Sequence, residues 1–515
     1  MTDTSFDDRT RRFMRAFLPE RISGSFKFDD FGIAISLDHR LSETRGGQLM
    51  ALAVLNNVSR FTRRIFLDFP AVTKRINVPH SRSSDFSTSI AELATNIDPS
   101  IVLDRKVLGA DRIDALVAIG SSRLNSDFNV TINSKGWLAE LSQDSALDYA
   151  TRDSNPIGAF AASALAGAEI FKQILRKLGS TNGAVEKKTQ HVLFSALDYS
   201  VDSRNPPNPA LPGAINIGET LLVGAGAVGG SLIFTLRYIE EARGYLTVVD
   251  HDKIDESNLN RYLIAGHDDV GKSKVDVASG FTGSDVRIRP ISAKYEDYAS
   301  GADSKTFDLV ISTVDNNQAR EEIQSDLPRV VIHGATHEQT FVVSRHNFTQ
   351  GACLGCLFFK QELSYPEQIS AETGIPIGEV ERVLSSNGAF SADHARTIVR
   401  EKGGDGKRLM SVIGLPFKEV YAKEICGTFG IQIGGDSAAA TSSFVSAMPG
   451  ILLAGELVKE RTKELQDYRL SNYFTMSLFS PLAAQVMFRQ KDPRCSCLCG
   501  EQIMINRYNQ KWGTN

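Results

Sequence analysis

A glycine-rich turn between a strand and a helix constrains the fold of this sequence most strongly. The run GETLLVGAGAVGGSLIFTL starts at Gly218 with apolar residues typical of a buried strand and continues with the pattern of a helix. Gly224, Gly226 and Gly229 separate the two, and Asp250 ends the next strand-like run about 20 residues later. Glycines at this spacing permit a tight turn, admit a phosphate to the backbone and let the helix pack on the strand. The segment predicts an α/β fold that binds a dinucleotide or ATP.

The first half of the chain repeats this plan in a weaker form. FDLVISTV and RVVIHGA continue the strands of the second half, while FGIAISL, RIFLDF and DALVAIGS predict buried strands in the first. The helical run NPIGAFAASALAGAEIFKQIL is similar to AMPGILLAGELVKE near the other end. Asp68 then mirrors Asp250, and Gly120-Ser121 takes the place of Asp315-Asn316. Since the first copy has no glycine turn, we expect it to keep the fold without holding a nucleotide.

A chain of 515 residues is too long for one hydrophobic core, and 42% hydrophobic residues suffice for several. We therefore predict two Rossmann-like α/β folds with an inserted helical subdomain. The expected boundaries are 1–180 for the inactive copy, 190–362 with 436–515 for the active copy, and 363–435 for the insertion. The polar run GSTNGAVEKK, from Gly179, links the copies. SAETGIPIGEVERVL in the insertion fits a helix–turn–helix, which we interpret as structural packing.

The composition excludes several classes of protein. A net charge of −4 with 23% charged residues gives no field that would draw the chain to nucleic acid or to an anionic membrane. No apolar run approaches the roughly 20 residues that cross a bilayer, and the run MTDTSFDDRTRR has no apolar signal core. We therefore expect a cytoplasmic protein without nucleic-acid or membrane partners.

A dense group of polar residues follows Asp250. The stretch VVDHDKIDESNLNRYLIAGHDDVGKSK adds Asp252, Asn258, Asn260, Arg261 and Lys274. It resembles the family that contains the sulfur-carrier activators of the molybdopterin and thiamine pathways and the ubiquitin-activating enzymes. Those proteins carry D-x-D, S-N-L-x-R-Q and G-x-x-K, then an aspartate after the next strand but one. Tyr262 departs from the pattern, because the family usually has glutamine there.

The resemblance implies a role for each matching residue. Asp250 would bind the ribose of ATP, Asn258 and Arg261 would orient and neutralise the phosphates, and Lys274 would bridge them. Asp315, in STVDNNQAR, would hold magnesium, with Arg320 in support. The nucleotide-binding residues expected are Gly224, Gly226, Gly229, Asp250, Asp252, Asn258, Arg261, Lys274, Asp315 and Asn316.

These residue types suit the attack of a carboxylate on the α-phosphorus of ATP. Fixed cations and magnesium reduce the repulsion between the two anions and stabilise the departing pyrophosphate. We therefore expect Arg261, Lys274 and Asp315 to be catalytic. A solvated charged loop is one alternative. A dehydrogenase would explain the glycine turn and Asp250, but hydride transfer gives no reason for cations gathered about phosphates.

The family also places an arginine from the partner copy at the phosphates. DDRTRRFMRAF supplies the candidates Arg9, Arg11, Arg12 and Arg15 on a predicted N-terminal helix. We choose Arg12, and a solvated basic helix face is the alternative.

Five of the six cysteines fall into two clusters. CLGC contains Cys353 and Cys356, and CSCLCG contains Cys495, Cys497 and Cys499. Four thiolates would form a closed tetrahedral site for structural zinc. The family pattern is CxxC…CxxC, so two of the last three cysteines would be ligands; DPRC favours Cys495 and the final CG favours Cys499. Small buried thiols without metal are the alternative.

The sixth cysteine, Cys426, stands alone in FKEVYAKEICGTFG. In ubiquitin-activating enzymes the thioester-forming cysteine lies in the same interval, after the first zinc pair and before the last helix. The resemblance implies that the Cys426 thiolate attacks the acyl-adenylate and expels AMP. A buried filler is the competing interpretation.

Together these features predict an enzyme that uses ATP and magnesium to adenylate the C-terminal glycine of a ubiquitin-like protein. Cys426 would then carry a thioester for transfer to a conjugating enzyme. The chain resembles the activators of bacterial ubiquitin-like conjugation systems in antiphage defence. The alternatives are a sulfur-carrier activator, which is usually shorter and homodimeric, a peptide C-terminal adenylyltransferase, and a non-catalytic scaffold. The oligomeric state stays open, a homodimer included.

Overall fold

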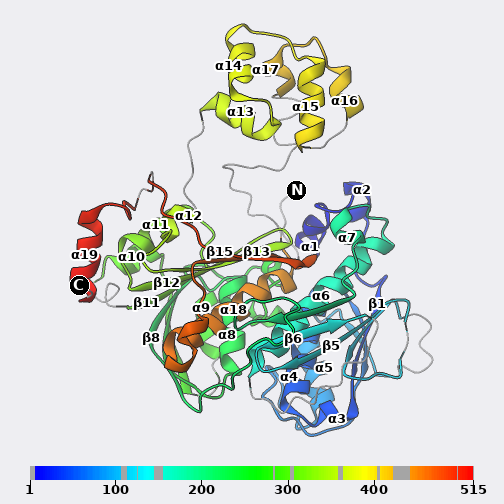
Figure 1. Ribbon diagram of the computed structural model, residues 1–515. Coiled ribbons are helices and arrows are strands. Elements are labelled where there is room, and N and C mark those ends of the chain that lie inside the picture. The colour runs from blue at the N-terminus through cyan, green and yellow to red at the C-terminus, as the bar shows by residue number, and fades with distance from the viewer. Residues whose placement is uncertain are drawn as a thin grey trace. The chain divides into compact units, whose positions relative to one another are not determined.

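The computed structural model describes residues 6–105, 113–124, 126–143, 155–281, 283, 285–301, 307–357, 364–402, 406–421, 441–493, 495 and 497–513. The chain divides into two compact units (Figure 1). Unit 1 is Met1–Leu357 with Ala439–Asn515, and unit 2 is Phe358–Ala438. In the described part of the chain, no helix has the length and apolarity to cross a membrane.

The first sheet of unit 1 has seven strands within the described residues. They are β1 (Gly32–Leu37), β2 (Arg64–Asp68), β3 (Val102–Asp104), β4 (Ala115–Ile119), β5 (Asn129–Lys135), β6 (Leu138–Ser142) and β7 (His191–Ser195). The order is β3-β2-β1-β4-β5-β6-β7, parallel as far as β5 and antiparallel beyond it. Strands β1 and β4 are buried at every position, as a parallel sheet covered on both faces requires.

The second sheet repeats this arrangement. Its described strands are β8 (Ile215–Val223), β9 (Ala242–Val249), β10 (Asp285–Ile291), β11 (Leu309–Ser312), β12 (Val330–His337), β13 (Thr340–His346), β14 (Tyr473–Ser477) and β15 (Ser480–Met487). The order β10-β9-β8-β11-β12-β13-β14 matches the first sheet strand by strand, with the same directions, and β15 adds an edge. The prediction of two Rossmann-like α/β folds is confirmed.

Helices surround both sheets. In the first copy they are α1 (Phe6–Met14), α2 (Glu20–Ser23), α3 (His39–Ser42), α4 (Arg45–Val58), α5 (Phe86–Ile97), α6 (Pro156–Lys177) and α7 (Gly183–Glu186). In the second they are α8 (Ala227–Arg237), η1 (Glu256–Asn258), η2 (His267–Asp269), α9 (Lys274–Gly280), α10 (Tyr295–Ala299), α11 (Asn317–Ser325), α12 (Leu354–Leu357), α18 (Ser443–Arg461), η5 (Lys463–Tyr468) and α19 (Gln502–Trp512).

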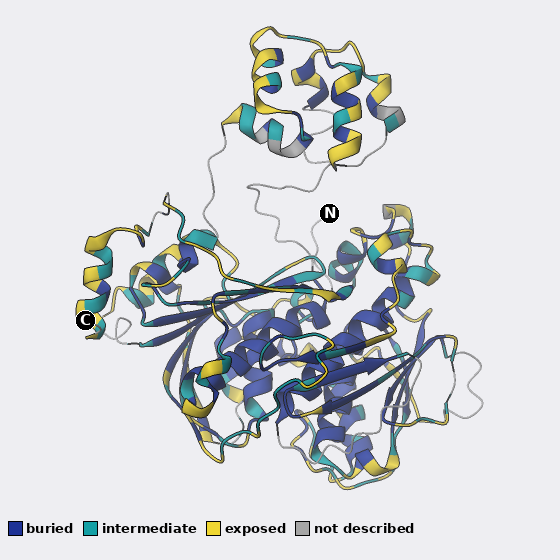
Figure 2. Ribbon diagram, viewed as in Figure 1, coloured by how far each residue is buried: buried dark blue, intermediate teal, exposed yellow. Residues whose placement is uncertain are grey.

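The two copies meet where α6 packs against α18, in the most buried part of the unit (Figure 2). Each helix carries a buried ion pair three residues apart, Glu169 with Lys172 on α6 and Glu456 with Lys459 on α18. The amine of Lys172 also donates to the carbonyl of Phe479 in the second copy, at 3.1 Å. The amine of Lys459 donates to the carbonyl of Leu197 in the first copy, at 2.7 Å. The copies are thus joined by reciprocal polar contacts inside an apolar core.

The described part of unit 2 consists of helices joined by short loops. It contains α13 (Tyr365–Thr373), α14 (Ile377–Ser385), α15 (Ala392–Lys402), α16 (Gly406–Ser411) and α17 (Phe417–Val420). These helices surround a small core of their own, in which Ile369, Val380 and Ile398 are fully buried. Gly374 ends α13 in the left-handed conformation, at φ 72°, and Val380 of α14 packs into that core. The domain boundaries taken from the sequence remain predictions.

Replacing Lys172 tests the contact between the copies. Lys172→Met leaves the buried Glu169 carboxylate without its closest cation, so we expect the free energy of unfolding to fall by about 3 kcal/mol. Urea unfolding followed by tryptophan fluorescence, to which Trp137 in the core of the first copy contributes, measures the change. Lys188→Met, at an exposed position, is the matched control and should change stability by less than about 0.5 kcal/mol. Equal unfolding midpoints for the two variants would contradict the interpretation.

Candidate active site

The carboxyl ends of β8 and β11 form the topological switch point of the second sheet. Strands β9 and β10 lie on one side of β8, and β11, the next strand along the chain, lies on the other side. Ligands of open parallel sheets bind in the crevice beyond such a point. The glycine turn follows β8 and Asp315 follows β11, so the fold brings these two predicted sequence motifs to the same edge.

The glycines of the turn are required by contacts that leave no room for a side chain. Gly224 has φ 96°, and a Cβ there would lie 2.8 Å from the hydroxyl of Thr313. A Cβ on Gly229 would lie 2.2 Å from the carbonyl oxygen of Gly224. The Thr313 hydroxyl donates to that same carbonyl at 2.7 Å, which ties the end of β11 to the turn. Sequence analysis missed Thr313, although it lies two residues before Asp315.

Asp250 fastens the second strand to the turn. One carboxylate oxygen accepts from the backbone N–H of Ala225 at 2.7 Å, and the other accepts from that of Asp252 at 2.8 Å. Each oxygen keeps lone-pair capacity for a further donor such as a hydroxyl. Asp250, His251 and Asp252 also present their side-chain oxygens and nitrogen within 4.8 Å of one another, which is a spacing that a cation could use.

Lys274 is 8% exposed and lies between carboxylates and an aromatic ring. Its amine is 2.7 Å from the carboxylate of Asp252 and 5.5 Å from the ring centre of Tyr262. Burial alone would lower the pKa of Lys274, but the Tyr262 hydroxyl and Asp250 outweigh it, so the pKa is raised. Lys274 therefore remains a cation. Tyr262, the departure from the family pattern, is buried, and its hydroxyl lies 3.3 Å from where a Cβ of Gly226 would be.

Arg261 is held by two oxygens of its own loop. Its guanidinium donates to the carbonyl of Ser257 at 3.0 Å and to the side chain of Asn260 at 2.7 Å. Burial lowers the pKa of Arg261 to about 10, and the charge of Arg9 acts in the same direction. The group is still protonated at neutral pH. Asn258 lies in the same loop, where its side-chain oxygen accepts from the backbone of Asp255 at 3.2 Å.

Arg9 brings a cation from the first copy to this site. Helix α1 contacts η1, and Arg9 lies close enough to Arg261 for its charge to affect that residue. Arg11 instead donates to the carbonyl of Phe26 at 3.3 Å and lies over the ring of Phe28. Arg12, the candidate taken from the sequence, lies on the same helix and stays a prediction, while the charge that acts on Arg261 is that of Arg9. Two like charges held together form a site that an anion would stabilise.

Asp315 and Asn316 lie at the start of α11. The Asn316 side chain caps the helix by accepting from the N–H of Ala319 at 2.8 Å, and Asp315 is exposed. Arg320 donates to the carbonyl of Val314 at 2.9 Å, which fixes the loop that carries Asp315. Burial lowers the pKa of Arg320 to about 10 against the opposing charge of Asp315.

Four cysteines converge at a second place in unit 1. Sγ–Sγ distances are 3.6 Å for Cys353–Cys356, 3.5 Å for Cys353–Cys495 and 3.3 Å for Cys356–Cys499. All four sulfurs lie within 4.8 Å of one another. Tetrahedral zinc with bonds of about 2.3 Å separates its thiolates by about 3.8 Å, so the set fits this metal. Cys497 lies beside the cluster, outside this group of four.

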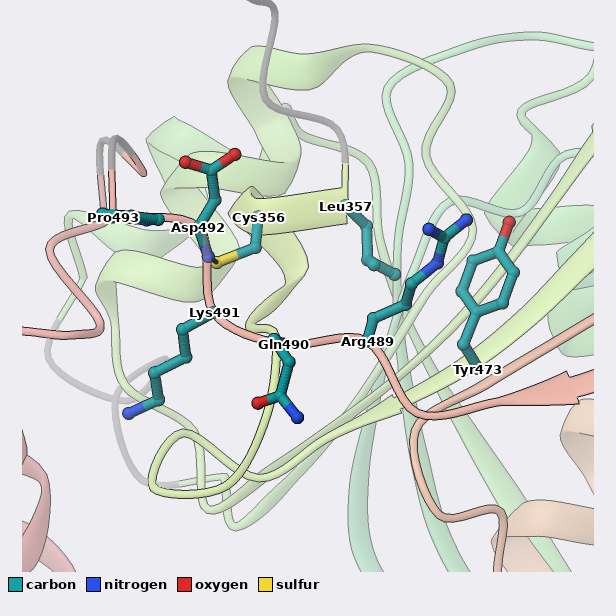
Figure 3. Close-up of a pocket in the computed structure, with 8 residues that line it drawn as sticks. All are labelled: Cys356, Leu357, Tyr473, Arg489, Gln490, Lys491, Asp492 and Pro493. Carbon is teal, nitrogen blue, oxygen red and sulfur yellow. Dashed lines mark hydrogen bonds between the residues drawn. The ribbon is translucent and has the colours of Figure 1, made fainter.

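A groove of about 590 Å³ opens beside the cysteine cluster (Figure 3). It is lined by Cys356, Leu357, Tyr473, Arg489, Gln490, Lys491, Asp492 and Pro493. Arg489 lies over the ring of Tyr473, at 5.0 Å from its centre. None of the predicted nucleotide-binding residues lines this groove. Cys426 lies outside the described residues.

Gly229→Ala tests the close packing of the turn. The added methyl group must displace the Gly224 carbonyl, so we expect a loss of about 1–3 kcal/mol in stability together with loss of nucleotide binding. Gly280→Ala is the matched control, because nothing lies within 4 Å of its Cβ position. Thermal unfolding and calorimetric titration with ATP compare the two. Unchanged ATP affinity in Gly229→Ala would contradict the assignment of the turn.

His346 predicts an acid-sensitive step in unfolding. Its ring nitrogens face the carbonyl of Ala352 at 2.7 Å and the hydroxyl of Ser344 at 2.9 Å, and burial lowers its pKa to about 4. Because the unfolded state takes up this proton first, stability is lost as pH falls from about 6.5 to about 4, by roughly 3 kcal/mol. Urea unfolding across this range should show a smaller loss in His346→Asn than in wild type. His337→Asn, at an exposed position, should follow wild type.

Two family models match this chain. The ThiF family model matches residues 214–497, and the model of the BilD N-terminal domain matches residues 32–191. The uncharacterized protein y4jF of Sinorhizobium fredii is 28% identical over 100% of this chain and 98% of its own length. The NEDD8-activating enzyme E1 catalytic subunit of Dictyostelium discoideum is 33% identical, but the match covers 27% of this chain and 31% of that relative.

One further sequence relative and one solved structure are also similar to parts of this chain. The SAMP-activating enzyme E1 of Haloferax volcanii is 26% identical over 44% of this chain and 86% of its own length. Among solved structures, E. coli MccB with MccA-N7isoASN is 15% identical at a TM-score of 0.35, covering 55% of this chain and 67% of that one. Because the ThiF model matches more than half of the sequence, the chain belongs to the ThiF family.

Proposed function

We propose that this chain adenylates the C-terminal glycine of a ubiquitin-like protein with magnesium-ATP and then carries it as a thioester on Cys426 for a conjugating enzyme. The observation that carries the first step is the gathering of Arg9, Arg261 and Lys274 about the glycine turn at the switch point. Three fixed cations at the amino end of a helix suit a triphosphate. A neutral substrate would leave the neighbouring charges of Arg9 and Arg261 without an opposing anion.

The residues divide the work of adenylation between them. The N–H groups at the start of α8 and Lys274 would bind phosphate oxygens, while Arg9 and Arg261 would stabilise the charge on pyrophosphate as it leaves. Asp250 would accept from the ribose hydroxyls. Magnesium, when bound, shields the triphosphate. The exposed carboxylate of Asp315 fits it, because this ion prefers oxygen ligands and keeps several waters.

The relatives support a protein substrate. The NEDD8-activating and SAMP-activating enzymes bear in their names the activation of a modifier, and their matches cover 27% and 44% of this chain. A ubiquitin-like protein is therefore the substrate class that we propose. A cytoplasmic setting and a role in antiphage defence belong to the same proposal and rest on the resemblance of the sequence.

We assign the first copy a supporting role without nucleotide. In the place of the glycine turn, Asp38 caps the four-residue helix α3 by accepting from Arg40 at 2.7 Å, and Ser121 donates to the same carboxylate. Burial would raise the pKa of Asp38, but these hydrogen bonds lower it, so the carboxylate stays ionised. A fixed anion there would repel a phosphate. The inactive copy would then contribute Arg9 to the active one.

Zinc is the metal that we propose for Cys353, Cys356, Cys495 and Cys499. Its role would be structural, because four thiolates leave no open position for a substrate. The cluster joins the segment before unit 2 to the last strands of the second sheet. Among the three C-terminal cysteines this choice leaves Cys497 as a free thiol.

One experiment separates the two proposed steps. Purified protein is mixed with magnesium-ATP and candidate ubiquitin-like proteins encoded nearby, and both ATP–pyrophosphate exchange and thiol-sensitive adducts are measured. We expect Asp315→Ala to lose exchange by about 100-fold or more and to lose the adduct. Cys426→Ala should retain exchange and lose only the adduct. Cys497→Ala is the matched cysteine control and should retain both.

The failures are distinguishable. Exchange without an adduct, unchanged in Cys426→Ala, would sink the thioester step and leave a sulfur-carrier or peptide adenylyltransferase. Absence of exchange with every candidate, together with unaltered ATP binding in Asp315→Ala, would reject adenylation at this site and favour a scaffold.

A further inference from the structure

The C-terminal helix α19 lies beyond the segment that matches the ThiF family, which ends at residue 497. It lies against the end of α11 (Figure 1), and three of its side chains donate hydrogen bonds to backbone carbonyls there. Tyr508 donates to Arg329 at 2.7 Å, Lys511 to Asp326 at 2.6 Å and Trp512 to Leu327 at 2.8 Å. These carbonyls immediately follow α11, which ends at Ser325, so α19 acts as a cap supplied from far along the chain.

The capped segment needs such support. Leu327 has φ 50°, in the left-handed region that helix ends usually give to glycine. A branched side chain persists in this conformation only where its surroundings hold it. Leu327 packs with Phe348, Tyr508 and the cysteine cluster in a small core separate from the main one, and the rings of Phe348 and Tyr508 stack at 5.6 Å.

The cysteine cluster holds α11 from a second side. The backbone N–H of Leu354, between Cys353 and Cys356, donates to the buried side chain of Gln324 at 2.9 Å. Tyr295 adds a bond of 2.7 Å to the carboxylate of Asp326. The carboxyl end of α11 is therefore fixed by α19, by the cysteine cluster and by α10.

The other end of the same helix carries the predicted metal-binding residue. Asp315 precedes the cap Asn316, and Arg320 ties the Val314 carbonyl to the first turn. A nine-residue helix is about 13 Å long and moves as a rod, so an altered position of its carboxyl end alters that of Asp315. In the first copy the chain runs from β4 to β5 without a helix among the described residues, and there Gly120-Ser121 replaces Asp315-Asn316. The helix and its clamp thus occur in the copy that carries the aspartate.

We propose that α19 and the cysteine cluster form a clamp that positions Asp315, and that Tyr508, Lys511 and Trp512 are positioning residues for the divalent cation bound with the nucleotide. The inference rests on the proposed function, because it gives Asp315 that cation. The inference goes beyond the proposed function in one respect. It states that α19 and the cysteine cluster, besides stabilising the fold, set the concentration of divalent cation that the site requires.

Binding of Mn²⁺ with a non-hydrolysable ATP analogue tests the clamp without the reaction. The double variant Tyr508→Phe/Trp512→Phe keeps an aromatic ring at both positions and removes two donors. We expect the Mn²⁺ concentration at half-saturation, followed by electron paramagnetic resonance, to rise about three- to ten-fold. Affinity for the analogue without Mn²⁺ should stay the same. Lys511→Met should act in the same direction and Lys511→Arg, which keeps a donor, should restore it. Arg507→Gln, exposed on the same helix, is the matched control.

A thermodynamic cycle separates positioning from general damage. In an Asp315→Ala background the clamp variants should add no further loss of Mn²⁺ affinity, since they act through that carboxylate. Hydrogen exchange in residues 313–320 should increase in the variants while that of β8 and β9 stays unchanged. Unaltered Mn²⁺ affinity in the clamp variants, or an equal loss with and without Asp315, would overturn the proposal. If the wild type binds no analogue, hydrogen exchange alone decides. Unchanged exchange in residues 313–320 of the clamp variants would overturn the proposal, and a selective loss of protection in these residues would support it.

These outcomes do not depend on adenylation. A protein that binds the analogue with Mn²⁺ through Asp315 but makes no adenylate would refute the proposed function and leave the clamp standing. If every clamp variant makes the adenylate with the same cation requirement as wild type, the proposed function stands and the clamp is refuted.

Discussion

The packing of α6 against α18 and of α18 against α8 is the contact on which unit 1 depends. Small residues make it close: a Cβ on Gly450 of α18 would lie 2.5 Å from Ser231 of α8, and one on Gly167 of α6 would lie 3.0 Å from Phe444. This closeness excludes water, so Lys172 and Lys459 must find oxygens within the protein, and each finds one in the other copy. A strictly apolar interface would tolerate sliding, whereas these paired donors fix one register.

The two copies share the same sheet topology, but their switch points carry different residues. Both sheets present the carboxyl ends of their central strands at a switch point, but the first fills it with Asp38 and Ser121 and the second leaves a glycine turn. The difference is in charge as well as in shape, because the first switch point holds the carboxylate of Asp38, whereas the second combines the carboxylates of Asp250 and Asp252 with the amine of Lys274. Fixing the copies also places α1 beside η1, so a helix of the first copy lies against the loop that carries Arg261 in the second.

The sequence was sufficient to predict the paired α/β sheets and the residues that belong to one local motif. Strand periodicity, the glycine turn and the two similar apolar helical runs are local patterns, and the structure confirms the paired sheets that they predict. Residues that act across the chain left no such pattern. Thr313 contacts a carbonyl 89 positions away, and Trp512 caps a turn 185 positions away. The sequence indicated Arg12, which stays a prediction; the charge that acts on Arg261 in the structure is that of Arg9, and this proximity depends on tertiary contact between α1 and η1.

The buried cations of the site favour an anionic ligand. Burial lowers the pKa of Arg261 and of Arg320, and Arg9 lies near enough to Arg261 to add to the effect, so the folded protein carries these charges at a cost. Proteins keep such an arrangement where a ligand of opposite charge removes the cost. A polyphosphate entering beside Gly226 would meet cations already desolvated and oriented, with little reorganisation left to make. The same charges that weaken the empty protein would then favour its nucleotide complex, so that binding and folding stability rise together.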